Sequence, residues 1–148
     1  MIFIGKWECW NWNYESMTEH KFIAKIHSLL SKEVFRWKIN DHYHGGVPDC
    51  FYSGPAGFCF IEYKYKNKKP ARRTTKIKFQ LTEQQRAWLY KQHKFGIPVY
   101  AALGIKNEVL LTQDFHKKEF SIQEFEEKAV HVKEFVDIIV NICLHKDT

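Results

Sequence analysis

The sequence predicts an α/β fold in which helices flank a mixed central β-sheet, in the order αβββαβ. Segments rich in strand-forming residues alternate with segments whose apolar residues recur at helical spacing. At the centre, a hairpin is followed by a helix and a further apolar strand. Because 148 residues fit one domain of ordinary size, we expect residues 1–148 to form a single domain.

The first helix is expected over residues 16–30. Ser16 is a suitable N-cap, Glu19 completes a capping box, and apolar residues recur at helical spacing as far as Leu30. Glu19 stands three residues before Phe22, so it lies at the end of the apolar stripe and faces the body of the protein. The simpler interpretation, in which Glu19 serves only the capping box, stays open.

Three strands are expected next, over residues 33–39, 47–52 and 58–66. The first is rich in strand formers and is ended by the turn-forming sequence NDHYHGG. The second and third form a hairpin, because the connecting sequence SGPAG is a strong turn signal.

The second half of the chain continues the alternation of helices and strands. A helix is expected from the N-cap Thr82 to about residue 94, with Gly96 as its stop. The remaining expected elements are strands over 97–103 and 108–112, a helix opening at Ser121 with Glu124, and a last helix over 133–144.

The composition is that of a globular protein, with 45% hydrophobic and 27% charged residues. No apolar run approaches the roughly 18 residues of a membrane span, and the N-terminus lacks a signal-peptide pattern, so we expect a soluble cytoplasmic protein without membrane contact. The four cysteines show no CxxC pairing, which favours isolated buried thiols over a zinc or disulfide framework. His42 and His44 lie in a turn without a cysteine pair, which favours a DNA-contacting or solvated loop over a metal site. The sequence contains no P-loop, which argues against an ATP-driven activity.

The N-terminal segment is rich in aromatic residues: Trp7, Trp10, Trp12 and Tyr14. Their spacing suits a short extended segment with one aromatic face. Core packing or a subunit interface is the favoured interpretation, and a stacking surface for nucleic-acid bases is the alternative.

The net charge is +6, and much of it is concentrated in one run that contains no acid. Its basic residues are Lys64, Lys66, Lys68, Lys69, Arg72, Arg73, Lys76 and Lys78. We call residues 66–78 the basic strip and expect it to bind phosphates. A solvated loop is the alternative.

The predicted hairpin places charged residues within an otherwise apolar stretch. Glu62 and Lys64 share one face of their strand, because side chains alternate along it. Asp49 follows Pro48 at the start of the preceding strand, and the hairpin brings it within reach of Glu62. Two carboxylates and one ammonium group at a partly buried place are costly unless other groups compensate them.

A divalent cation accounts for this group better than a salt bridge does. A salt bridge between Lys64 and one acid leaves the second acid and the basic strip unexplained. Mg²⁺ prefers oxygen ligands and completes its shell with waters and phosphate oxygens. Lys64 would then align or activate an attacking water and offset charge on the phosphate.

With these residues the sequence resembles the PD-(D/E)xK nuclease superfamily. Pro48-Asp49, a spacer of twelve residues and Glu62-Tyr63-Lys64 match its signature, and Glu19 stands in the place of its early acidic residue. In the VRR-NUC and Holliday junction resolvase branches, a basic segment, a helix opening like L-S-x-x-Q, a glycine and a hydrophobic strand follow. Here LTEQQ opens the helix at 81–85, and IPVYA follows Gly96. The resemblance covers about residues 17–111, and a clear VRR tripeptide is missing.

The resemblance implies a restriction-endonuclease-like core and a catalytic set consisting of Glu19, Asp49, Glu62, Lys64 and Gln85. By that likeness, Asp49 and Glu62 are metal ligands together with the backbone carbonyl of Tyr63. Lys64 serves the water, and Gln85 orients the lysine or a phosphate. The implied cofactor is Mg²⁺, with Mn²⁺ as a substitute. Phage and homing endonucleases of this superfamily are similar in length and basicity, which suits a bacterial or phage-infected host cell.

We therefore expect a Mg²⁺-dependent DNA endonuclease that binds DNA through the basic strip. Cutting both strands of a duplex favours a homodimer or a higher symmetric homo-oligomer, with contacts through the aromatic N-terminus and the last helix. One alternative is a non-catalytic nucleic-acid-binding module in which Asp49, Glu62 and Lys64 form a buried ion-pair cluster. The other is a nuclease of the same fold that acts on RNA.

Overall fold

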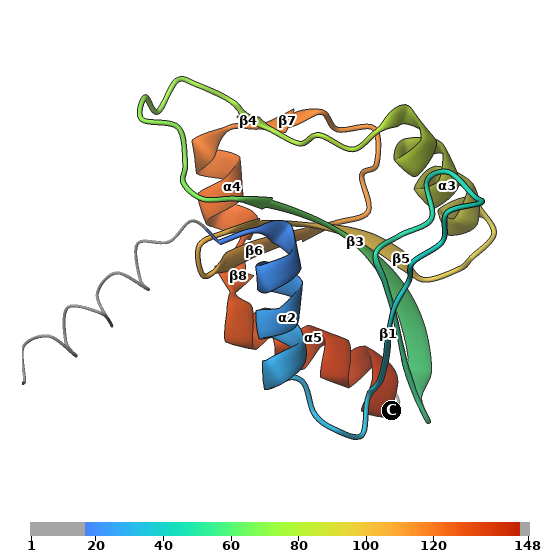
Figure 1. The fold of residues 1–148 in the computed structure, drawn as a ribbon. Helices are drawn as coiled ribbons and strands as arrows, with labels where there is room; N and C mark the ends of the chain where they lie inside the picture. Colours follow the sequence, from blue (N-terminus) through green and yellow to red (C-terminus); the bar gives the residue numbers. More distant parts are fainter. Residues whose placement is uncertain (1–16, 146–148) are drawn as a thin grey trace, which may run out of the picture.

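The computed structural model describes residues 17–145, which form a mixed β-sheet with helices on both faces (Figure 1). The helices are α2 (Glu19–Leu29), α3 (Glu83–Lys94), α4 (Ile122–Lys128) and α5 (Val132–Leu144). The strands are β1 (Phe35–Lys38), β2 (Cys50–Gly54), β3 (Gly57–Lys66), β4 (Ile77–Lys78), β5 (Val99–Ile105), β6 (Glu108–Thr112), β7 (Glu119–Phe120) and β8 (Val130–His131). The predicted order αβββαβ is confirmed from α2 to β5, with the short strand β4 added before α3.

The main sheet has the strand order β1-β2-β3-β5-β6-β8. Its parallel pair is β3 with β5, which are connected through α3, and its other neighbouring strands pair antiparallel. Strands β4 and β7 form a separate two-stranded sheet. The predicted strand, helix, strand passage therefore lies at the centre of the sheet.

The sheet separates two apolar clusters. Figure 1 shows α2 and α5 on one side of the sheet, and β4, β7 and α3 on the other. Ile61 and Tyr63 of β3 belong to the cluster under α2 and α5, whereas Phe60 packs against the cluster that contains Leu89 of α3. Since side chains alternate along a strand, Glu62 and Lys64 share the face of Phe60.

Helix α2 begins later than the sequence suggested. Its N-cap is Thr18, whose hydroxyl accepts the N–H of Lys21 at 3.2 Å, and Ser16 lies outside the described residues. The predicted capping box is therefore wrong, because Glu19 is the first helical residue and not the third. The carboxylate of Glu19 is left to reach towards the sheet.

Two further strand boundaries differ from the prediction for a common reason. β2 begins at Cys50 and β5 at Val99, in each case later than predicted. Pro48 and Pro98 precede them, and proline carries no N–H to donate to a ladder.

The last helix uses its apolar face within its own chain. Phe135, Val136, Ile139 and Cys143 of α5 are buried in the cluster beneath α2. These four side chains are therefore not available to a partner, because they pack within this chain's own core. The other expected contact surface, the aromatic segment at residues 7–14, lies outside the described residues.

Two expectations drawn from composition can be compared with the described part of the chain. Cys50, Cys59 and Cys143 are buried free thiols, as expected. No helix within residues 17–145 combines the length and apolar character that crossing a bilayer requires.

Candidate metal centre

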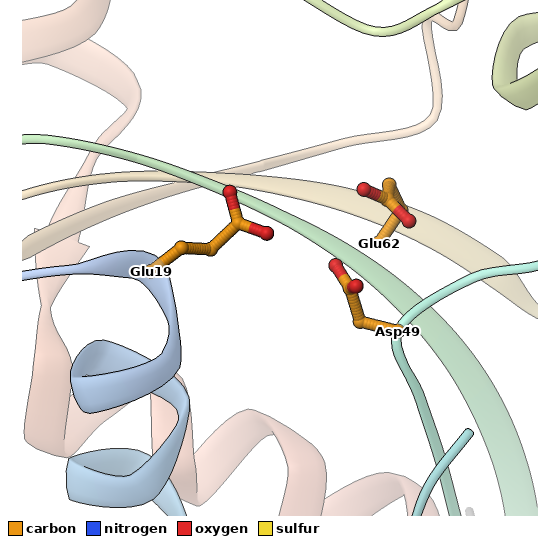
Figure 2. A group of neighbouring side chains, drawn as sticks. All are labelled: Glu19, Asp49 and Glu62. Carbon is orange, nitrogen blue, oxygen red and sulfur yellow. The ribbon is translucent and has the colours of Figure 1, made fainter. Parts of the chain in front are cut away.

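Three carboxylates from separate elements converge at one place (Figure 2). Glu19 comes from the first turn of α2, Asp49 from the residue before β2, and Glu62 from β3. One oxygen of each lies within 4.8 Å of the others. A group of carboxylate oxygens at this separation suits a hard divalent cation, which prefers oxygen ligands.

Asp49 is positioned where the ladder between β2 and β3 ends. The last paired residues are Cys50 and Ile61, and beyond them the N–H of Tyr63 donates to Oδ2 of Asp49 at 2.8 Å. The carbonyl oxygen of Asp49 accepts the N–H of Ile39 at 2.8 Å, which extends the pairing with β1. Side chain and backbone of Asp49 are thus held by both neighbouring strands.

Glu62 is almost completely buried, with 1% of its surface exposed. Its Oε2 lies 3.4 Å from Nζ of Lys64 and accepts a hydrogen bond from Nε2 of Gln85 at 3.2 Å. Its Oε1 is buried and has no hydrogen-bond partner among the described residues. A buried polar atom without a partner is costly, so Oε1 is the atom that an additional ligand would satisfy.

The pKa of Glu62 is raised to about 9, mainly by burial and next by the charge of Asp49, and Lys64 offsets these two effects only in part. Burial also raises the pKa of Glu19, and the charge of Asp49 is the next largest cause that raises it. Without a cation, Glu62 is therefore mainly protonated at neutral pH, which weakens its electrostatic attraction to Lys64. A bound cation would favour the ionised carboxylates.

Gln85 is held in place by the N-terminus of α3. Its backbone N–H donates to the hydroxyl of Thr82 at 3.1 Å, and its side-chain Oε1 accepts the N–H of Thr82 at 2.9 Å. This capping box uses Oε1 and leaves Nε2 for Glu62. The sequence predicted Thr82 as the N-cap, and the structure confirms it.

The loop that leads to Asp49 rests on the same helix terminus. Gly46 has a positive φ of 87°, and a Cβ there would lie 2.3 Å from the carbonyl oxygen of Gln84. Only glycine allows this close approach at a positive φ. The approach brings the loop before Asp49 and the first turn of α3 together.

The residues that the sequence singled out as catalytic therefore lie together. Glu19, Asp49 and Glu62 form a cluster of three carboxylates, and Lys64 and Gln85 contact Glu62. Their catalytic roles, and the role of the Tyr63 carbonyl, stay predictions.

Sequence reasoning missed how Tyr63 is anchored. Its hydroxyl contacts that of Tyr52 at 2.8 Å, and Tyr52 in turn contacts Nε2 of His27 at 2.8 Å. This buried chain fixes the strand that carries Glu62 and Lys64. Nothing in the local spacing of these residues signals the contact.

The basic strip forms part of a surface pocket of about 350 Å³. The lysines that line it are Lys66, Lys68, Lys69, Lys76 and Lys78. Lys66 is on the face of β3 that also carries Lys64 and Glu62. The pocket is therefore a candidate continuation of the metal centre.

Folding brings acids to part of this strip. Lys69 lies 3.2 Å from Glu108 and 3.8 Å from Glu126, and Arg73 lies 2.6 Å from Glu126. Within residues 17–145, no acid forms an ion pair with Lys66, Lys68, Arg72, Lys76 or Lys78. These five are the basic residues whose charge is available to a ligand.

The histidines of the turn are separate from the carboxylate group. His44 pairs with Asp41 at 2.8 Å and is exposed, and neither His42 nor His44 belongs to the metal-competent group found among residues 17–145.

Comparisons with known proteins support the fold. The sequence matches no protein-family model and no curated protein. The structure is similar to Hjc, a Holliday junction resolvase from the archaeal hyperthermophile Archaeoglobus fulgidus, with a TM-score of 0.50 and 11% identity, covering 82% of this chain and 97% of that chain. At this identity the similarity shows the fold alone. The predicted fold class, a restriction-endonuclease-like mixed sheet flanked by helices, is confirmed.

Proposed function

We propose that this chain is a Mg²⁺-dependent endonuclease that hydrolyses phosphodiester bonds in DNA. The observation that carries the proposal is the convergence of Glu19, Asp49 and Glu62. Glu62 also has a buried oxygen with no hydrogen-bond partner among residues 17–145, and Lys64 lies on the same strand face. The fold, which is similar to that of a Holliday junction resolvase, supports a nuclease. The available lysines next to the site support a phosphate-containing substrate.

The donor set fits a magnesium ion. Glu19, Asp49 and Glu62 would hold the ion, together with the backbone carbonyl of Tyr63, and Mn²⁺ is expected to substitute because carboxylate oxygens suit both ions. When bound, the ion supplies a water of lowered pKa and neutralises charge on the phosphate.

The remaining residues act on the substrate and on the ligands. Nζ of Lys64 would position the attacking water and offset charge that develops on the phosphate. Gln85 fixes one oxygen of Glu62 from a side chain that is itself locked by the capping box. The chain thus provides a site organised before the substrate arrives.

The rival interpretation, a structural ion-pair cluster, leaves more groups unsatisfied. The contact between Lys64 and Glu62 uses Oε2 and leaves Oε1 of Glu62 without a partner among the described residues. The carboxylates of Glu19 and Asp49 lie in the same cluster, so three carboxylates would have to share the ammonium group of Lys64. The other alternative, an RNA-directed nuclease of the same fold, would cleave RNA in place of DNA. A comparison of cleavage on the two substrates therefore distinguishes it from the proposed DNA endonuclease.

The test is a cleavage assay on duplex, branched and single-stranded DNA and on duplex RNA. Wild-type protein should cut DNA with Mg²⁺, and with Ca²⁺ it should bind DNA without cutting, since looser coordination does not hold the water in line. Lys64→Ala should remain folded and bind DNA but not cut it. Lys66→Ala, which removes the next lysine on the same face, should weaken binding and still cut at saturating protein.

The two interpretations predict different results for Lys64→Ala. If the residues form a structural ion-pair cluster, that variant should lose about 3 to 5 kcal/mol of stability, because a buried pair is broken. Metal should then have no effect on the melting temperature. A folded variant that still cuts at the wild-type rate would overturn the proposed role of Lys64.

We further propose that the active form is a homodimer or a higher symmetric homo-oligomer. Cutting both strands of a duplex requires two metal centres or one that repositions. Residues 17–145 contain one cluster of three carboxylates that could hold a metal ion. Light scattering at working concentration should show more than one copy. A monomer that makes double-strand cuts efficiently would contradict this.

A further inference from the structure

A partly exposed aromatic surface lies beside the candidate metal centre, over β1, β2, β3 and α3. We call it the aromatic face, and its residues are Phe35, Trp37, Phe51, Phe58, Phe60 and Trp88. Phe35 is 59% exposed and Trp37 is 53% exposed. Contiguous apolar patches, unlike single scattered apolar residues, are typical of binding surfaces.

The rings form one continuous surface. The ring centroids of Trp37 and Phe51 are 6.4 Å apart, those of Phe51 and Phe60 are 4.9 Å apart, and those of Phe60 and Trp88 are 5.6 Å apart. The surface therefore extends from the edge strand β1 to α3 without a break.

The aromatic face is continuous with the metal centre along β3. Phe58, Phe60, Glu62, Lys64 and Lys66 alternate along this strand and share one of its faces. A DNA strand with a phosphate at Glu62 thus meets lysines towards one end of β3 and aromatic rings towards the other. Cations suit phosphates, whereas aromatic rings suit bases.

A pocket of about 400 Å³ adjoins the aromatic face through Trp37 and Phe60. Ile39, which also lines the pocket, donates its N–H to the carbonyl oxygen of Asp49 at 2.8 Å. Trp37, Phe60 and Tyr43 contribute aromatic walls, and Asn40, Asp41 and His42 contribute polar groups. Its volume lies within the range of small-ligand sites, about 300 to 1,000 Å³. Aromatic walls with a few polar groups are the chemistry that holds an unstacked nucleobase.

We propose that the aromatic face and this pocket bind unpaired bases of the DNA strand next to the cleaved phosphate; this inference rests on the proposed function. Bases inside a duplex are stacked on each other and offer no ring face to these side chains. Unpaired bases stack on aromatic rings with little dependence on sequence. The substrate class is therefore DNA in which a single-stranded segment adjoins the cleavage site.

A second copy of the chain is the rival occupant, because aromatic residues are enriched at protein interfaces. Phe60 and Glu62 are separated by one residue and share a face, so a subunit seated on the aromatic face would obstruct the approach to the metal centre. The polar pocket at its border also favours a ligand with hydrogen-bonding edges, which a base provides.

The test compares a blunt duplex with the same duplex extended by a single-stranded arm, using the full chain. Affinities are measured with Ca²⁺, and 2-aminopurine at the first unpaired position reports stacking by loss of fluorescence. Wild type should bind the extended DNA about tenfold more tightly and quench the probe. Trp37→Ala should lose most of this preference and keep its affinity for the blunt duplex, whereas Trp37→Phe should retain most of it.

The control variant is Phe95→Ala, since Phe95 is 65% exposed and makes no ring contact with the aromatic face among the described residues. It should bind both DNAs as the wild type does. Equal affinity of the wild type for the two DNAs, or an equal loss on both in Trp37→Ala, would overturn the inference. A wild-type dimer that Trp37→Ala converts to a monomer, with unchanged DNA preference, would also overturn it and assign the face to a second copy.

Failure of this inference differs from failure of the proposed function. If wild type cuts blunt and extended DNA equally with Mg²⁺, only the aromatic-face assignment is wrong. If it neither binds nor cuts any DNA, the nuclease proposal itself is wrong.

Discussion

At the scale of single residues, the burial of Glu62 links metal binding to protonation. Glu62 is 1% exposed, and its pKa is raised to about 9, mainly by burial and next by the charge of Asp49. In the unfolded chain the same group ionises near its ordinary value of about 4.3. Between these two values the folded metal-free protein holds a proton that the unfolded chain has lost, so this residue makes stability fall as pH rises towards 9.

Mg²⁺ should therefore raise the melting temperature more at about pH 8.5 than at about pH 6.5. At the lower pH the ion must displace the proton of Glu62, which weakens binding; near the pKa of about 9 that cost largely disappears. Thermal melts with and without Mg²⁺ at both pH values measure the difference.

Glu62→Gln is the matched control for this prediction. It keeps an oxygen that can accept from Gln85, removes the titrating group, and should abolish the response to Mg²⁺ at both pH values. In wild type, equal shifts at the two pH values would show that Glu62 does not titrate on metal binding.

At the scale of elements, helix α2 brings Glu19 to the site because Phe22 fits against a glycine of β5. A Cβ on Gly104 would lie 2.4 Å from Cζ of Phe22. Phe22 is fully buried and packs against Tyr65, with ring centroids 4.8 Å apart, so it has little room to move. The position of Glu19 thus depends on a close approach between a helix and a strand.

Gly104→Ala should destabilise the protein by about 1 to 3 kcal/mol and reduce cleavage, because overpacking displaces Phe22 and with it the first turn of α2. Denaturant unfolding and the cleavage assay measure the two effects. Gly96→Ala is the control: Gly96 has a φ of 82° but no atom within 4 Å of an added Cβ, so it should cost stability through the backbone alone and leave cleavage intact. Wild-type stability in Gly104→Ala would contradict this account of α2.

What the sequence could predict at this scale was local. The hairpin that joins Asp49 to Glu62, and the helix that begins at Thr82, follow from turn, capping and alternation signals within short windows. The bond from the Tyr63 N–H to Asp49 depends on where two strands diverge, which no local pattern encodes.

The aromatic face escaped prediction for a related reason. Both faces of β3 are rich in apolar residues, since Cys59 and Ile61 alternate with Phe58 and Phe60. This pattern predicts a strand whose two faces are both buried. Which face stays exposed depends on where α3 packs, and α3 covers only part of the sheet.

At the scale of the whole molecule, charge is arranged by folding more than by sequence. The run from Lys64 to Lys78 contains no acid, yet Glu108 and Glu126 from distant segments pair with Lys69 and Arg73. Within residues 17–145, Lys66 and Lys68, which line the pocket of the basic strip, form no ion pair with an acid, so their charge is available to a ligand.

DNA binding should therefore depend on the lysines that form no ion pair within the described part of the chain more than on the paired residues Lys69 and Arg73. Each lost phosphate contact lowers the slope of log affinity against log salt by about 0.9 on duplex DNA, so Lys68→Ala with Lys76→Ala should lower it by about 1.8. Lys69→Ala with Arg73→Ala removes the same formal charge from groups already neutralised by Glu108 and Glu126, and should lower the slope less. Binding titrations over a salt series with Ca²⁺ give both slopes. If the two double variants change the slope equally, these ion pairs do not withhold charge from DNA; if neither changes it, the basic strip lies outside the interface.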